Sequence, residues 1–85
     1  MALNITYFAW VRERMGIAEE TVDLPASVTD VGGLVHWLAA RDARGKIAFA
    51  EPHRIRVAID GVMMGTDAPL SGAKEVALFP PVTGG

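Results

Sequence analysis

The sequence contains no cysteine and only two histidines. The missing cysteine excludes a disulfide framework, a cysteine-ligated zinc site and a thiol nucleophile. No apolar stretch approaches the roughly 18 residues that a membrane-spanning helix needs, and the first residues lack the basic start and apolar centre of a signal peptide. We therefore expect a cytoplasmic protein without a membrane partner.

Positive charge is also scarce. The chain has 8 Lys and Arg against 10 Asp and Glu, a net charge of -2, so it offers no basic field to attract nucleic acid. Its densest basic group is Arg41, Arg44 and Lys46, which we interpret as part of a solvated loop. Charged residues make up 21% of the chain and hydrophobic residues 51%. This balance indicates either a slightly apolar small domain or an exposed face that binds a partner.

The 85 residues suit a single domain, and the alternation of apolar and polar residues predicts its strands. In the first strand, Leu3, Ile5 and Tyr7 face the core, so Phe8 and Trp10 point away from it. The predicted strands cover residues 3–10, 20–24, 54–59, 62–64 and 75–79.

A helix is predicted between the second and third strands. Ser27 is its expected N-cap, and Asp30 completes an imperfect capping box. An irregular crossover over residues 45–53 follows, held to the core by Ile47 and Phe49. The apolar stripe of this helix consists of Val28, Val31, Leu34, Val35 and Leu38.

Glycines mark the expected turns. A helical turn after the first strand stops at Gly16, and Asp60-Gly61 predicts a tight turn between two strands. The pair Gly32-Gly33 inside the helix has no explanation in the sequence, because its spacing is not that of a phosphate-binding loop.

The order of elements is strand, strand, helix, strand, short strand, strand. It predicts an α+β fold in which a mixed sheet packs on one main helix, the β-grasp or ubiquitin-like layout. The predicted division is a β-grasp domain over residues 1–81 and a flexible, extended C-terminal Gly-Gly tail over residues 82–85. The double proline before the tail ends the last strand and stiffens the exit of the chain.

Catalytic side chains are hard to find in this sequence. His36 and His53 have no metal ligand at a useful spacing, so no metal site is expected. The serines and threonines have no visible base, which argues against a nucleophilic triad. We therefore expect that the chain is not an enzyme on its own.

The end of the sequence carries the main chemical signal. Gly84 and Gly85 have no side chains, so the end can enter a narrow channel that a larger residue would block. It would deliver the terminal carboxylate of Gly85, which becomes an acyl donor once a partner enzyme adenylates it with ATP. The alternative is a frayed terminus without a function.

Residues 78–85, Leu-Phe-Pro-Pro-Val-Thr-Gly-Gly, closely resemble the end of the small subunits of molybdopterin synthase, the MoaD-type sulfur carriers. Departures at Asp60, at Ala73-Lys74 and at Leu78 affect turns, surface charge and one core position, and leave the tail intact. The resemblance continues along the chain in Tyr7-Phe8-Ala9, Val11-Arg12-Glu13, the Ser27-capped helix, Pro69-Leu70 and Glu75-Val76-Ala77.

The resemblance implies a sulfur carrier of molybdenum cofactor biosynthesis. An E1-like adenylating enzyme would activate Gly85 with ATP, and a sulfurtransferase system would replace the AMP by sulfur, giving a thiocarboxylate. Val82, Thr83 and Gly84 would carry Gly85 into the large subunit, whose side chains supply the catalysis in a heterotetramer. There the sulfur would pass to cyclic pyranopterin monophosphate, forming the dithiolene of molybdopterin. No cofactor bound stably to this chain is implied.

The resemblance also implies an exposed apolar patch that docks both partners. Its residues are Phe8, Met63 and Phe79, with Arg12 beside them for a polar contact. Three alternatives stay open: a sulfur carrier for the thiamine thiazole or for cysteine, a ubiquitin-like modifier joined to lysines through Gly85, and a passive interaction module.

Overall fold

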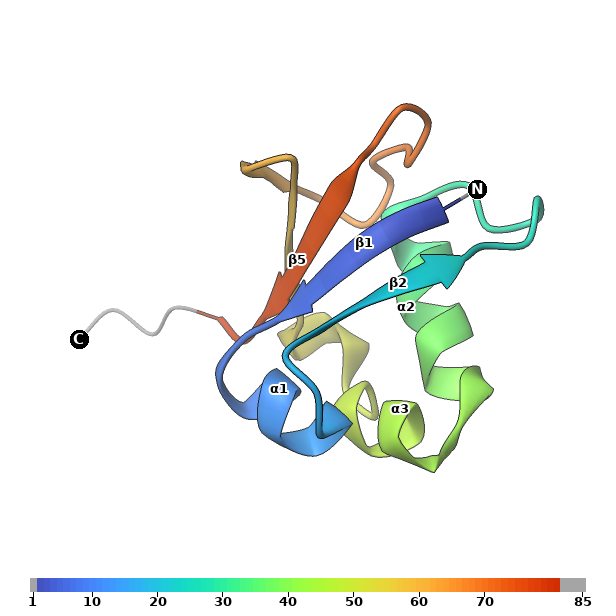
Figure 1. Cartoon of the computed structure of the whole chain (residues 1–85). Coiled ribbons are helices and arrows are strands. Elements are labelled where there is room, and N and C mark those ends of the chain that lie inside the picture. Colours follow the sequence, from blue (N-terminus) through green and yellow to red (C-terminus); the bar gives the residue numbers. More distant parts are fainter. Residues whose placement is uncertain (1, 82–85) are drawn as a thin grey trace.

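The structure is a computed structural model that describes residues 2–81. Along the chain, the strands of one sheet are interspersed with short helices (Figure 1). The strands are β1 (Ala2–Tyr7), β2 (Glu19–Asp23), β3 (Arg56–Ile59), β4 (Val62–Met64) and β5 (Glu75–Phe79). The helices are α1 (Ala9–Met15), α2 (Val31–Arg41), α3 (Ala43–Ala48) and the single 3-10 turn η1 (Pro52–Arg54).

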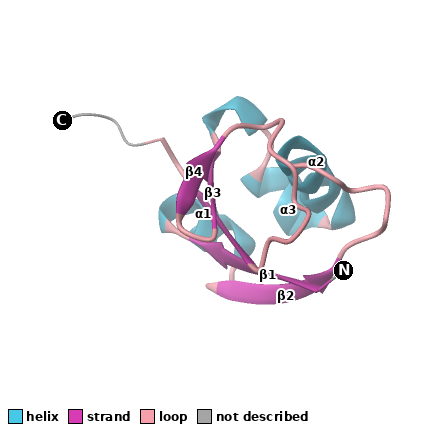
Figure 2. Cartoon of the chain, turned by 90° about the horizontal axis from the view of Figure 1, so that it is seen from above, coloured by secondary structure: helices cyan, strands magenta, loops and turns pink. Residues whose placement is uncertain are grey.

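The strands form one mixed sheet in the order β2-β1-β5-β3-β4. β1 runs parallel to β5, and the other neighbours are antiparallel. Helix α2 covers one face of the sheet, and α1 lies at one end of the sheet next to α3 (Figures 1 and 2). The described part of the chain places no helix over the opposite face. The mixed sheet on one main helix is therefore confirmed.

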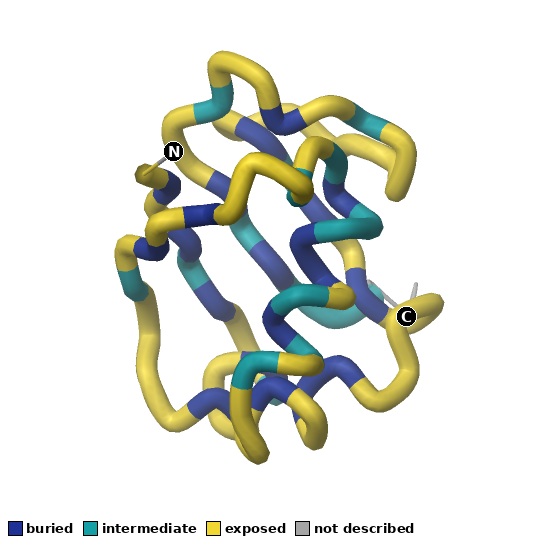
Figure 3. Tube along the Cα trace, turned by 90° about the vertical axis from the view of Figure 1, so that its right-hand side faces the viewer, coloured by how far each residue is buried: buried dark blue, intermediate teal, exposed yellow. Residues whose placement is uncertain are grey.

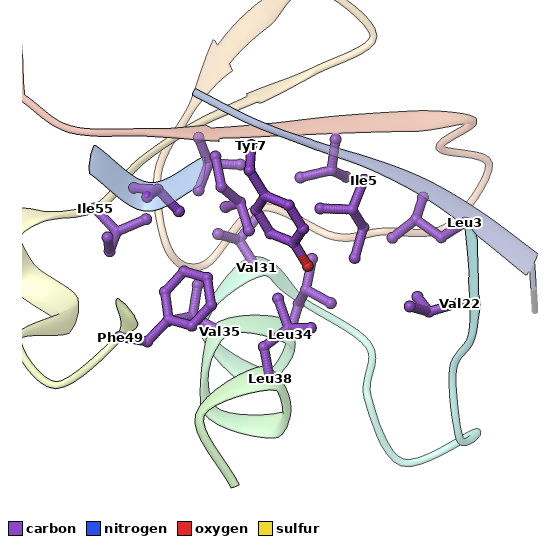
Figure 4. Packing of buried hydrophobic residues seen from close by; sticks show 14 of the residues in the cluster. Leu3, Ile5, Tyr7, Val22, Val31, Leu34, Val35, Leu38, Phe49 and Ile55 are labelled. Atoms are coloured by element: carbon purple, nitrogen blue, oxygen red, sulfur yellow. The ribbon is translucent and has the colours of Figure 1, made fainter. Parts of the chain in front are cut away.

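The core lies between the sheet and α2 (Figures 3 and 4). Leu3, Ile5 and Tyr7 of β1 and Val76 and Leu78 of β5 are at most 1% exposed, as the alternation predicts. Figure 4 shows the Tyr7 ring directed from the sheet toward α2. Each such side chain contributes about 1.5–3 kcal/mol by leaving water, which ties β1 and β5 firmly into the middle of the sheet.

The first predicted strand is too long at its C-terminal end. Ala9 and Trp10 belong to α1, and Phe8 is the extended N-cap of that helix. The chain turns here because Ala9 adopts a left-handed conformation with φ 52°, which an alternating sequence pattern cannot reveal. The stop at Gly16 is confirmed, since this residue caps α1 with φ 77°.

The N-cap of the main helix lies three residues after the predicted one. Its N-cap is Asp30, whose Oδ1 accepts the Gly33 N–H at 2.8 Å, so the prediction of Ser27 is wrong. The first two N–H groups of the helix, those of Val31 and Gly32, donate to carbonyl oxygens of the loop between β4 and β5. That loop therefore fixes where the helix starts, and Val28 lies before it.

Close approach of neighbouring atoms explains the Gly32-Gly33 pair, and Gly32 meets the same loop. A Cβ on Gly32 would lie 3.3 Å from the carbonyl oxygen of Thr66, and one on Gly33 would lie 3.0 Å from the capping oxygen of Asp30. Both positions therefore favour glycine by close approach, which no local pattern contains.

The predicted irregular crossover contains a further helix, α3. Its N-cap Asp42 accepts the Gly45 N–H at 2.8 Å. Ile47 is 61% exposed, so its predicted anchoring role is wrong, whereas Phe49 is 2% exposed and is confirmed in the core.

The basic group Arg41, Arg44 and Lys46 is not a solvated loop, since these residues lie in α2 and α3. Arg41 binds a carboxylate of β2. The Nη1 of Arg44 donates to the carbonyl oxygen of Met15 at 3.4 Å, which links α3 to α1.

Candidate functional site

The face of the sheet without a helix gathers apolar side chains near the end of β5. Ala58 pairs with Met63 on one side and with Ala77 on the other. Because paired residues point to the same face of a sheet, these three side chains form one row. Met63 is 60% exposed at the edge strand β4, and Ala58 and Ala77 are half-buried.

A second row holds the two aromatic residues. Phe79 is half-buried and pairs with Arg56 of β3, and the Phe8 N–H donates to the carbonyl oxygen of Leu78 at 3.0 Å. This bond continues the pairing of β1 with β5 beyond Tyr7, so Phe8 lies beside Phe79. We call Phe8, Ala58, Met63, Ala77 and Phe79 the docking patch.

The backbone at Phe8 is fixed although its side chain is 47% exposed. The Phe8 carbonyl oxygen accepts the N–H groups of Val11 and Arg12 at 3.1 and 3.4 Å. The left-handed Ala9 that follows costs about 1–2 kcal/mol for a residue with a Cβ. Strain of this kind persists only where surrounding contacts hold it, and here it turns the chain sharply after Phe8.

Arg12 lies on α1, one turn after Phe8, and is exposed. The structure thus brings Phe8, Met63 and Phe79 onto one face, with Arg12 on the adjoining helix. Sequence reasoning missed Ala58 and Ala77, whose small side chains complete the surface between the larger ones. The alternation of residues in β3 and β5 already places both on the outward face, but it gives no reason to count them in the patch.

The predicted tail residues Val82, Thr83, Gly84 and Gly85 lie outside the described residues. The described chain ends at Pro81, shortly after β5. β5 ends at Phe79 inside the docking patch and close to α1 (Figure 1). Any segment that continues from β5 therefore starts at the border of this patch.

A polar network beneath the sheet supports the β1 end of the patch. The Tyr7 hydroxyl donates to Glu20 Oε2 at 2.6 Å. The Arg41 guanidinium donates to both oxygens of the same carboxylate, at 2.9 and 2.8 Å. Arg41 holds the pKa of Glu20 below its ordinary value of 4.5, and burial together with the Glu20 carboxylate raises the pKa of Tyr7. The network ties β1, β2 and α2 together.

The other polar residues singled out by the sequence have structural roles. Asp60 adopts φ 48° in the tight turn, and its Oδ1 accepts the Glu75 N–H at 2.9 Å. His53 Nε2 lies 3.8 Å from Glu51, at the surface. Residues 2–81 contain no group of three or more His, Cys, Asp or Glu that could hold a metal ion. No helix within the same residues is long and apolar enough to cross a membrane.

Comparison with known proteins gives matches along nearly the whole chain. The ThiS family model matches residues 5–85. The molybdopterin synthase sulfur carrier subunit of Escherichia coli (strain K12) is 34% identical over 83 residues, covering 98% of this chain and 99% of that relative. A relative of the same name from Haemophilus influenzae is 30% identical over 83 residues, with the same coverage of 98% and 99%. The crystal structure of small archaeal modifier protein 1 of Haloferax volcanii has a TM-score of 0.69 at 24% identity and covers 95% of this chain and 98% of that chain.

Proposed function

Because this chain belongs to the ThiS family and folds as a β-grasp domain, we propose that it is the sulfur carrier subunit of a molybdopterin synthase. Relatives that bear this name match it over nearly their whole length. The geometric observation that carries the proposal is the end of β5 at Phe79, inside an exposed apolar patch on the open face of the sheet. A partner that covers this patch would receive the chain as it leaves β5.

The proposed chemistry takes place on the main chain at Gly85. A carboxylate oxygen of Gly85 attacks the α-phosphorus of ATP, pyrophosphate leaves, and an acyl-adenylate forms. Sulfur at the sulfide level, supplied by a sulfurtransferase system, then attacks the acyl carbon and displaces AMP, which leaves a thiocarboxylate and a proton. This route needs no side-chain thiol, which agrees with a sequence free of cysteine, and no cofactor bound to this chain. Since activation consumes ATP, the proposed location is the cytoplasm.

The proposed partners divide the work between them. An E1-like adenylating enzyme activates the tail. The large subunit of the synthase then takes Val82, Thr83, Gly84 and Gly85 into its active site. Its side chains catalyse sulfur transfer to cyclic pyranopterin monophosphate, and two copies of each subunit form a heterotetramer. The docking patch and Arg12 are the surface proposed to contact both partners, which fits the exposure of Phe8 and Met63.

Reconstitution of a synthase that lacks its small subunit tests this function. We expect the activated wild-type chain to restore molybdopterin formation and the variant without Gly84 and Gly85 to restore none. The truncated chain should keep its fold, because the sheet, the helices and the buried core cluster that the structure describes lie within residues 2–81. Equal molybdopterin formation by the truncated chain would refute the proposal.

The same assay separates the alternative functions. A carrier for the thiamine thiazole or for cysteine would form the thiocarboxylate and yet fail to restore molybdopterin. A protein modifier would leave Gly-Gly remnants on lysines of cellular proteins. A passive interaction module would show no dependence on Gly84 and Gly85.

A further inference from the structure

Two arginines from separate parts of the chain stack on one tryptophan at the end of the molecule where β5 finishes. The guanidinium carbon of Arg14, in α1, lies 4.2 Å from the ring centroid of Trp10. That of Arg54, in η1, lies 5.6 Å from the same centroid. Trp10 itself is half-buried against the core. The indole therefore holds two like charges close together that would otherwise separate into solvent.

A third arginine places this cluster next to the docking patch. Arg56 pairs with Phe79 across the sheet. Its Nη1 donates to the carbonyl oxygens of His53 and Ile55, at 2.9 and 3.4 Å. Arg14, Arg54 and Arg56 are all exposed. We call these three arginines, with Trp10 beneath them, the cationic rim.

The charge of the rim is only partly balanced. Within residues 2–81, Arg14 and Arg56 have no carboxylate at ion-pair distance. Arg54 has one contact, 3.8 Å to Glu51, between exposed side chains, and such a pair is weak. Glu13 is the acidic residue of α1 and is exposed. With Arg12, the region holds four arginines against these two carboxylates, a local excess of two positive charges in a chain of net charge -2.

The acidic residue of β5 lies at the opposite end of this strand. Glu75 begins β5 and pairs with Asn4, whereas Phe79 ends β5 and pairs with Arg56. Positive charge is thus concentrated at the end of the sheet from which the tail continues. Arginine suits such a position, because its planar guanidinium binds carboxylates through two parallel hydrogen bonds.

From this arrangement we infer that the cationic rim docks an acidic surface on the large subunit of the synthase, around the site that receives the tail. The inference rests on the proposed function. A protein that covers the docking patch and accepts the chain beyond Phe79 must also face the rim, and the large subunit is the proposed partner that holds this chain in a heterotetramer. Charges at the edge of an interface act mainly by steering association, so the rim should raise the rate at which the complex forms.

The experiment compares two variants of equal net charge. Arg14→Gln/Arg54→Gln removes two positive charges from the rim, and Lys46→Gln/Lys74→Gln removes two exposed charges elsewhere. Association with the purified large subunit is followed by stopped flow between about 0.02 and 0.2 M salt. We expect the rim variant to associate about tenfold more slowly at low salt, with a flatter salt dependence, and the lysine variant to change by less than about twofold.

A charge-retaining variant separates the effect of lost charge from the effect of a damaged fold. Arg14→Lys/Arg54→Lys keeps both charges, so its association rate should stay within about threefold of wild type. Equal slowing in the arginine-to-glutamine and lysine-to-glutamine variants, or no slowing in either, would overturn the rim inference. So would slowing in the lysine variant together with an unchanged rate in the rim variant. If the wild-type chain forms no complex at all, the proposed function itself has failed.

Discussion

Replacing Glu20 by glutamine should destabilise the fold by about 2 kcal/mol. The carboxylate accepts the Tyr7 hydroxyl and two Arg41 N–H groups. The side chains of Arg41 and Glu20 are 26% and 19% exposed. Water therefore has little access to take over a hydrogen bond that the substitution removes. Hydrogen bonds to a charged group contribute about 1.5–3 kcal/mol each when buried. The amide keeps one acceptor and turns a donor toward Arg41, so we expect loss of roughly one such bond.

The expected loss has a characteristic pH dependence. Arg41 lowers the pKa of Glu20 in the folded chain from the ordinary 4.5. A lowered carboxyl pKa stabilises the fold above the unfolded pKa, and this contribution disappears as the pH falls through the folded pKa. The wild type should therefore lose more stability than Glu20→Gln on acidification below 4.5, and the two should converge.

Urea unfolding at several pH values measures this difference, with the slope of the transition as a check on two-state behaviour. Glu19→Gln is the matched control, since Glu19 is exposed on the neighbouring position of β2, and it should change stability by less than about 0.5 kcal/mol. At neutral pH, Glu20→Gln should lower the Tm by about 10 °C. An equal loss in both variants, or a difference that persists at acidic pH, would show that the network does not hold β1 and β2 to α2.

Three other predictions test separate features. Gly45→Ala should lose about 2–3 kcal/mol in urea unfolding, because its Cβ would lie 1.9 Å from the Leu38 carbonyl oxygen; wild-type stability would contradict this close approach. Ala9→Gly should gain about 0.5 kcal/mol by relieving the left-handed strain, whereas Ala40→Gly within α2 should lose about 1 kcal/mol; equal losses would argue against the strain. Phe8→Ala should bind the large subunit about tenfold more weakly by calorimetry, with the Tm almost unchanged; unchanged affinity would remove Phe8 from the docking patch.

The strands follow closely from the sequence because their pattern is local. The alternation in Leu3, Ile5 and Tyr7 and in Val76 and Leu78 is enough to predict which face of each strand is buried, because only one face of the sheet packs against the core. The tight turn at Asp60-Gly61 is equally local, because both residues must adopt positive φ.

The helix boundaries depend on distant contacts and were harder to predict. Ser27 and Asp30 are both good caps by residue type. Asp30 prevails because Val31 and Gly32 hydrogen-bond to the loop before β5. The turn at Ala9 likewise relies on the Phe8 N–H bonding to β5, which no short window of sequence contains.

The candidate site likewise has features that follow from local sequence patterns and features that depend on distant contacts. The exposure of Phe8 follows from the alternation of β1, and Phe79 points to the same open face as predicted. The cationic rim was not predicted, because Trp10 and Arg54 meet only in the folded chain. The ion pair of Arg41 with Glu20 was missed for the same reason.

The intact mass of the chain after activation tests the central claim most directly. The wild-type chain is incubated with ATP, its cognate adenylating enzyme and a sulfur source, beside the variant that lacks Gly84 and Gly85. We expect the wild type to gain the mass of one sulfur-for-oxygen exchange, located in the C-terminal peptide, and the variant to gain nothing. An unchanged wild-type mass, or a gain located elsewhere in the chain, would contradict a sulfur carrier that acts through Gly85.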